Sequence, residues 1–184
     1  MAAFTVIDHT ELGAANAELV EITSIPSSYD HLYMVMSVRD DGASTSPTEF
    51  WMRVGNGSPD TGTNYSNTGL SANTATPDSG RNTGQTHTSF GLYSPQNSST
   101  ANTFGAVAVW IPNYANTSNY KQILSRSGCE AASTTNNYWK VAMGGHLWAS
   151  TSAIDVVQVV TYDVGTWGDF MQYSTFTLYG VTGA

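Results

Sequence analysis

The chain has little charge, few basic residues and a single cysteine: six Lys and Arg stand against fourteen Asp and Glu, for a formal charge of −8. A nucleic-acid surface needs a cluster of basic side chains that displaces counterions, and these six are scattered along the sequence. We therefore expect no nucleic-acid partner. Cys129 has no partner for an intrachain disulfide, and we interpret it as a small buried side chain.

Long apolar runs and secretion signals are also missing. The longest apolar run, Val156 to Val160, is interrupted by Gln158 and is too short to cross a bilayer. The first four residues, Met1 to Phe4, have neither the basic start nor the apolar core of a signal peptide. We expect no membrane partner and synthesis in a host cytoplasm without a signal peptide.

The spacings that usually carry catalysis or a metal ion are absent from the sequence. No two of the four histidines stand two or four residues apart, and a lone cysteine makes no CxxC pair. The segment from Gly55 to Pro59 lacks the Gly-x-Ser-x-Gly pattern of a nucleophile elbow. The aspartates are typical of turns rather than of a glycosidase pair. We predict no enzyme, no catalytic residue and no cofactor; a carbohydrate-active enzyme on a sandwich fold is the weaker hypothesis.

Short runs that alternate apolar and polar side chains dominate the chain. Leu32, Met34, Met36 and Val38 fall on one face of an expected strand from His31 to Arg39. The stretch from Ser174 to Val181 alternates in the same way, and we expect this last strand to pair inside the sheet. About eight or nine such strands, with no convincing helix, predict an all-β fold: a two-sheet β-sandwich or jelly roll.

One domain is expected for a chain of this length. We place the β-sandwich at residues 21–184 and an N-terminal arm or extended segment at 1–20. Residues from about 55 to 88 are almost wholly Gly, Ser, Thr, Asn and Pro, and this composition predicts a long loop.

Oxygen-bearing residues recur at alternate positions of the segment from Asp60 to Tyr65. Asp60, Gly62 and Asn64 are a weak calcium candidate, because hard cations prefer oxygen ligands. A structural Asx turn uses the same residues and is the favoured interpretation, so no metal site is predicted.

Five tryptophans and ten tyrosines form a large aromatic set. Exposed aromatic rings stack on sugars or fill subunit interfaces, whereas buried rings belong to the core. Trp148 and Trp167 lie beside glycines where loops are expected to begin, and Tyr65 follows the candidate cation loop. These three are predicted contacts for a protein partner or a glycan.

Several short blocks stand in order along the chain, at residues 25–32, 56–66, 111–121, 144–154 and 174–181. Taken in this order, they resemble a family of small bacteriophage virion proteins that occur as capsid decoration (cement) proteins or as tail-fibre domains. The blocks cover most of the chain from Ile25 onward, and their order carries the resemblance more than any one of them.

The resemblance implies an assembly protein without catalysis, a β-sandwich homotrimer on the virion surface. We expect a decoration protein on the exterior of the head that binds between subunits of the major capsid protein and stabilises the shell. Many modest contacts of this kind add up through multivalency. The alternative is a receptor-binding or fibre-tip module that recognises host-surface glycan, which would make carbohydrate a partner.

Overall fold

The computed structural model describes residues 3–13, 17–43, 47–73, 76–129, 140–162 and 168–183. Every regular element in these residues is a β-strand, and none is a helix. The described part of the chain therefore contains no helix long and apolar enough to cross a membrane. The predicted all-β class is confirmed.

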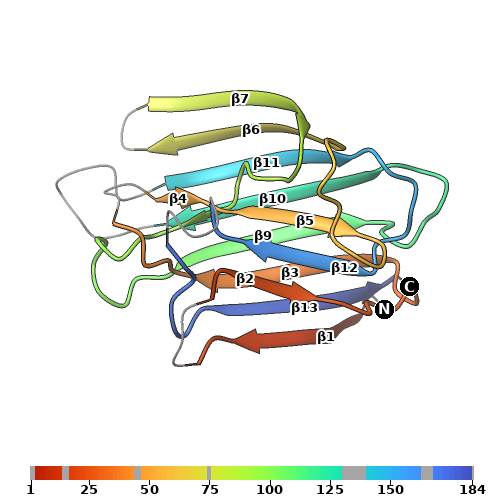
Figure 1. The fold of residues 1–184 in the computed structure, drawn as a ribbon, viewed down its shortest axis with the longest axis horizontal. Coiled ribbons are helices and arrows are strands. Elements are labelled where there is room, and N and C mark those ends of the chain that lie inside the picture. Colours follow the sequence, from red (N-terminus) through yellow and green to blue (C-terminus); the bar gives the residue numbers. More distant parts are fainter. Residues whose placement is uncertain are drawn as a thin grey trace.

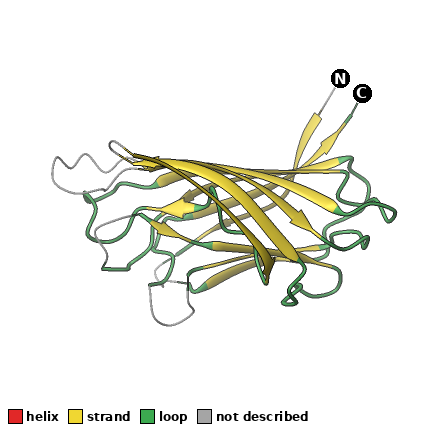
Figure 2. Ribbon diagram, turned by 90° about the horizontal axis from the view of Figure 1, so that it is seen from above, coloured by secondary structure: helices red, strands yellow, loops and turns green. Residues whose placement is uncertain are grey.

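The strands form two main layers, and every pair is antiparallel (Figures 1 and 2). The large sheet contains eight strands in the order β1 (Ala3–Glu11), β13 (Thr175–Thr182), β3 (His31–Val38), β9 (Gly105–Pro112), β10 (Lys121–Cys129), β11 (Lys140–Trp148), β6 (Tyr65–Asn73) and β7 (Thr76–Gln85). The small sheet contains β2 (Leu19–Ile22), β12 (Val156–Val160) and β5 (Trp51–Gly55), and β4 (Thr48–Glu49) pairs with β8 (Tyr93–Ser94). This arrangement is consistent with a β-sandwich.

The core lies between the two main sheets, and the alternating pattern of the strands fills it. Leu32, Met34, Met36 and Val38 on β3 are each at most 2% exposed, as their spacing predicts. The last strand, β13, pairs with β1 on one side and β3 on the other, so the predicted position of the chain's final strand inside the sheet is confirmed.

The predicted N-terminal arm is an edge strand of the large sheet. Residues Ala3 to Glu11 pair with β13 over almost their whole length. They bury little, since Phe4 is 57% and Val6 54% exposed. The segment is therefore held mainly by backbone pairing.

The predicted long loop at about 55–88 is wrong over most of its length, because Tyr65–Asn73 and Thr76–Gln85 form the β6–β7 hairpin. The hairpin lies at the opposite edge from β1. Most side chains of β7 are exposed, so its strand formation does not need the apolar alternation that identified the other strands.

The inner face of the large sheet beside this hairpin is covered by residues 86–92, here called the covering segment. A row of in-register residues, Ser125, Gly144, Gly69 and Gly80, crosses four strands beneath it. A Cβ atom on Gly144 would lie 2.2 Å from the Phe90 carbonyl oxygen, and one on Gly69 would lie 2.6 Å from the Phe90 side chain. The three glycines thus leave the space that Phe90 occupies.

Gly144→Ala should lower the free energy of unfolding by about 1–3 kcal/mol, because the new methyl group collides with backbone of the covering segment. Gly145→Ala is the matched control: its added Cβ meets no atom within 4 Å, on the opposite face of the same strand. Urea unfolding of the two variants measures the difference. Equal stabilities would contradict the close packing of Phe90 on the glycine row.

Candidate functional site

The outer face of the large sheet carries exposed apolar side chains. The alternation that places one set of residues in the core places Val35, Leu70, Leu124, Val141 and Met143 outside, where they are 40% to 61% exposed. They come from β3, β6, β10 and β11, so they gather only through sheet pairing. Among the described residues, no segment of the chain lies over this face.

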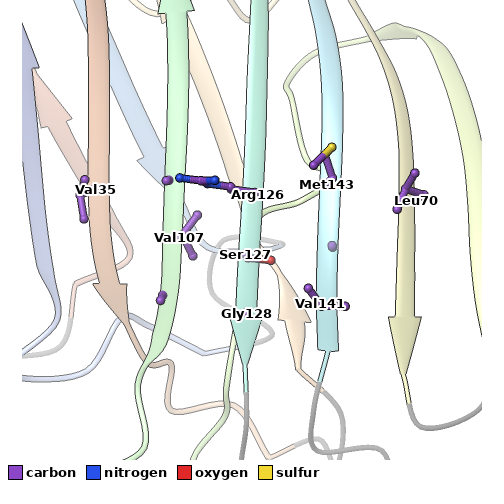
Figure 3. Close-up of a pocket in the computed structure, with 11 residues that line it drawn as sticks. Val35, Leu70, Val107, Arg126, Ser127, Gly128, Val141 and Met143 are labelled. Atoms are coloured by element: carbon purple, nitrogen blue, oxygen red, sulfur yellow. The ribbon is translucent and has the colours of Figure 1, made fainter. Parts of the chain in front are cut away.

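A groove of about 520 Å³ runs over the middle of this face (Figure 3). Small residues form its floor, with Ala106 and Ala108 on β9 and Gly128 on β10. Larger side chains from the flanking strands, among them Leu70 and Val35, form its sides. We call this hollow the aliphatic groove.

Arg126 is the one charged side chain among the residues that line the aliphatic groove. Figure 3 shows its guanidinium extending from β10 over β9. No described residue offers it a hydrogen bond or an ion pair. Arg126 is exposed, so its guanidinium donors are open to water or to a ligand that covers this face.

A second hollow of about 270 Å³ lies beside the first, and we call it the aromatic hollow. Tyr33, Trp110 and Leu124 line it, and it shares Ala108, Arg126 and Met143 with the aliphatic groove. The rings of Tyr33 and Trp110 are 6.0 Å apart at an angle of 57°. Phe4 of the edge strand meets Tyr33 edge-on at 5.8 Å, which extends the apolar surface toward β1.

The residues of the weak calcium candidate do come together, as a hydrogen-bonded turn. Asp60 accepts from the Gly62 amide at 2.8 Å, from Asn64 Nδ2 at 2.8 Å and from Trp148 Nε1 at 2.7 Å. Burial alone would raise the pKa of Asp60, but the hydrogen bonds from Trp148, Asn64 and Gly62 outweigh it and lower the pKa. Both carboxylate oxygens therefore serve the turn. Among the described residues, no group of three or more His, Cys, Asp or Glu side chains is placed to hold a metal ion.

Two of the three predicted aromatic contacts are core residues. Trp148 is 2% and Tyr65 is 1% exposed, so neither can meet a partner. The position of Trp148 is fixed by the hydrogen bond that its Nε1 donates to Asp60. The Tyr65 hydroxyl donates to the Val54 carbonyl at 2.9 Å. Trp167 lies outside the described residues. The glycines near Trp148 are strand residues rather than the loop starts that its predicted exposure assumed.

A buried polar network, which the sequence did not reveal, lies under the covering segment. Ser125, His146 and Asn67 come from the neighbouring strands β10, β11 and β6, and each is at most 2% exposed. Ser125 Oγ is 2.8 Å from His146 Nε2, and His146 Nδ1 is 2.8 Å from Asn67 Oδ1. The order of groups is that of a nucleophile, a base and an orienting residue. In the described arrangement, however, no substrate can reach Ser125.

The network instead ties the covering segment to the sheet. Asn67 Nδ2 donates to the His87 carbonyl at 3.1 Å, which leaves Asn67 Oδ1 to accept from His146 Nδ1. His146 Nε2 is then an acceptor, and it shares the Ser125 hydroxyl with the Phe90 carbonyl. Desolvation by burial lowers the pKa of His146 to about 4, while the Phe90 carbonyl raises it slightly. The ring is therefore neutral at pH 7.

Comparison of the chain with protein-family models, with curated proteins and with solved structures finds no match.

His146 should make the protein less stable in mild acid. Its pKa is about 4 in the folded protein and about 6.5 in the unfolded chain, so the unfolded chain binds the proton first. Its stabilising contribution is complete above pH 6.5 and falls as the pH drops toward 4, by about 3 kcal/mol in all. Urea unfolding from pH 7 to 4 measures the loss.

The comparison of wild type with His146→Gln isolates this residue. His87, with a pKa near 4, and Asp40, with a pKa near 7, titrate in both proteins. The difference in unfolding free energy between the two proteins should shrink as the pH falls. A difference that stays constant from pH 7 to 4 would show that His146 is not held neutral.

Proposed function

We propose that this protein is a non-catalytic structural protein of a bacteriophage virion, a capsid decoration protein that binds between major capsid protein subunits on the exterior of the head. The observation that carries the proposal is the apolar outer face of the large sheet. Contiguous apolar surface of this kind marks a contact with another macromolecule. The ordered sequence blocks that resemble phage virion proteins support the choice of partner.

The extent of the face suits such a contact. Seven neighbouring strands at about 4.8 Å, over about five residues at 3.3 Å each, give a projected area of about 550 Å². Stable pairwise interfaces bury about 800 Å² per partner, so the projected area of the face is about two thirds of a standard contact. Decoration adds many copies at equivalent positions, so a contact of this size is sufficient.

The proposal includes a homotrimer and a jelly-roll form of the sandwich. Edge strand β1 supports self-association, because Phe4 and Val6 are more than half exposed and one side of its backbone is unpaired by the described residues. This contact is separate from the aliphatic groove, so a trimer joined at β1 leaves the groove free for the shell.

A receptor-binding module that recognises host-surface glycan is the second candidate. The aromatic hollow favours it, because Tyr33 and Trp110 present ring surfaces beside Arg126. Aromatic rings stack on sugar faces, and the guanidinium would take an acidic group.

Leu70→Glu and Val141→Glu should each abolish binding to phage heads that lack this protein, because a carboxylate would enter the apolar contact. Leu19→Glu is the matched control: Leu19 is 43% exposed and lies on β2 of the small sheet. Co-sedimentation with purified heads measures the binding. Heads that bind the groove variants as well as wild type would refute docking through this face, and binding to tails alone would favour the second candidate.

Val6→Lys should convert the trimer to monomer, since a lysine on an edge strand blocks pairing with another chain. Val6 is 54% exposed, so the folded monomer should keep its stability. Native mass spectrometry gives the copy number, and thermal unfolding checks the fold. A wild-type protein that is monomeric at every concentration would remove the trimer from the proposal.

A further inference from the structure

The centre of the outer face is organised in three parallel rows across the strands. The middle row is Val35, Ala108, Arg126, Met143 and Leu70, which are in register across β3, β9, β10, β11 and β6. A second row is displaced from the middle row by two residues along the strands, and it contains Ala106, Gly128 and Val141. The third row is displaced by two residues in the opposite direction, and it contains Tyr33, Trp110 and Leu124.

These rows place the single charge between two apolar hollows. The aliphatic groove extends from the middle row toward Ala106 and Val141, and the aromatic hollow extends from it toward Trp110 and Leu124. Arg126 lines both hollows. The order along the strand direction is therefore apolar hollow, guanidinium, apolar hollow.

The spacing of the rows matches that of an extended polypeptide. Residues two apart in a strand rise by about 6.7 Å, and side chains at i, i+2 and i+4 of an extended segment lie on one face with the same repeat. A segment lying along the strand direction can therefore place three successive same-face side chains on the three rows.

We propose that the outer face binds an extended protein segment with a Glu or Asp at its centre and an apolar residue two positions away on each side. The assignment rests on the proposed function and names the partner chemistry of the same surface. The central carboxylate pairs with Arg126. The two apolar side chains enter the aliphatic groove and the aromatic hollow.

Charge complementarity requires the carboxylate. Covering the face with an apolar surface alone would bury the Arg126 guanidinium without a partner, which is strongly unfavourable. A carboxylate accepts two parallel hydrogen bonds from a guanidinium and fixes the position of the segment. A face-to-face pair of two copies centred on this row would instead bring two Arg126 side chains together, because β10 lies in the middle of the face.

The lining favours a peptide over a sugar. Arg126 and the buried Ser127 are the polar side chains among the residues of the aliphatic groove, beside aliphatic and small residues. A sugar brings several hydroxyl groups that need hydrogen-bond partners, and the groove offers few. Aliphatic side chains need none.

The test titrates the intact protein with synthetic peptides and follows the Arg126 Nε–Hε signal by NMR. The probe is acetyl-Thr-Leu-Thr-Glu-Thr-Leu-Thr-amide, which is symmetric about the acid, so either strand direction is tested. The control peptide carries Gln in place of Glu. A third peptide, acetyl-Thr-Leu-Glu-Thr-Thr-Leu-Thr-amide, puts the acid and the first leucine on opposite faces.

The Glu peptide should bind wild type about tenfold more tightly than the Gln peptide, as expected for a charge-assisted pair. In Arg126→Gln the two peptides should bind equally. Arg81→Gln is the matched control for net charge, because Arg81 is exposed on β7, outside the groove lining, and it should retain the preference. The third peptide should bind no better than the Gln peptide.

Equal binding of the Glu and Gln peptides to wild type, or no shift of the Arg126 signal, would overturn the inference. A shift produced by oligogalacturonate but not by the Glu peptide would overturn it in favour of an acidic sugar. Failure of the proposed function gives a different result. If the protein prefers the Glu peptide but the groove variants still bind heads, the peptide site is kept and decoration through this face is rejected. If the groove variants lose binding to heads but the protein shows no preference for the Glu peptide, decoration through this face is kept and the acidic-peptide site is rejected.

Discussion

The unequal width of the two main sheets is the constraint on which the rest of the structure depends. Eight strands face three, so the small sheet alone cannot cover the inner face of the large one. Beside the β6–β7 hairpin the chain supplies cover with residues 86–92, and this cover needs both room and attachment. Gly144, Gly69 and Gly80 provide the room, and the hydrogen bonds of Ser125 and Asn67 to the Phe90 and His87 carbonyls provide the attachment. A buried, neutral His146 joins the two polar side chains, so packing and hydrogen bonding at this place form one unit.

The same strands face the opposite problem on their outer side. An antiparallel sheet with one face on the core normally turns polar residues to water on the other. Here the outward positions of β10 and β11 include Leu124, Val141 and Met143, and the outward positions of β9 are small or aromatic. The proposed assembly role gives this pattern a physical reason, since side chains that contact a partner are shielded from water as core side chains are. Arg126 fits the same view as a residue that sets position within an otherwise non-directional contact.

Alternation along one strand was enough to predict the strands that line the core. It identified β3 and β13, because Leu32 to Val38 and Phe176 to Leu178 bury one face each. It could not identify the β6–β7 hairpin, whose glycines serve the covering segment and whose polar residues face water. The outer groove was equally hidden, because Ala106, Gly128 and Leu70 are unremarkable in sequence and meet only through the register of three strand pairs. Trp148 and Tyr65 were misjudged because exposure is a property of the tertiary fold: each ring fills the core, and the polar atom of each bonds near the Asp60 turn.

The pairing of β1 with β13 has a consequence for how the molecule forms. Ala3 lies opposite Thr182, so β1 has no partner until β13, far along the chain, has been synthesised. β13 also separates β1 from β3, so the large sheet cannot acquire its final order before β13 has been made. Contacts between such distant parts of a chain make folding slow. During that interval, the alternating apolar residues of β3 and β9 are exposed to other nascent chains, so aggregation competes with folding.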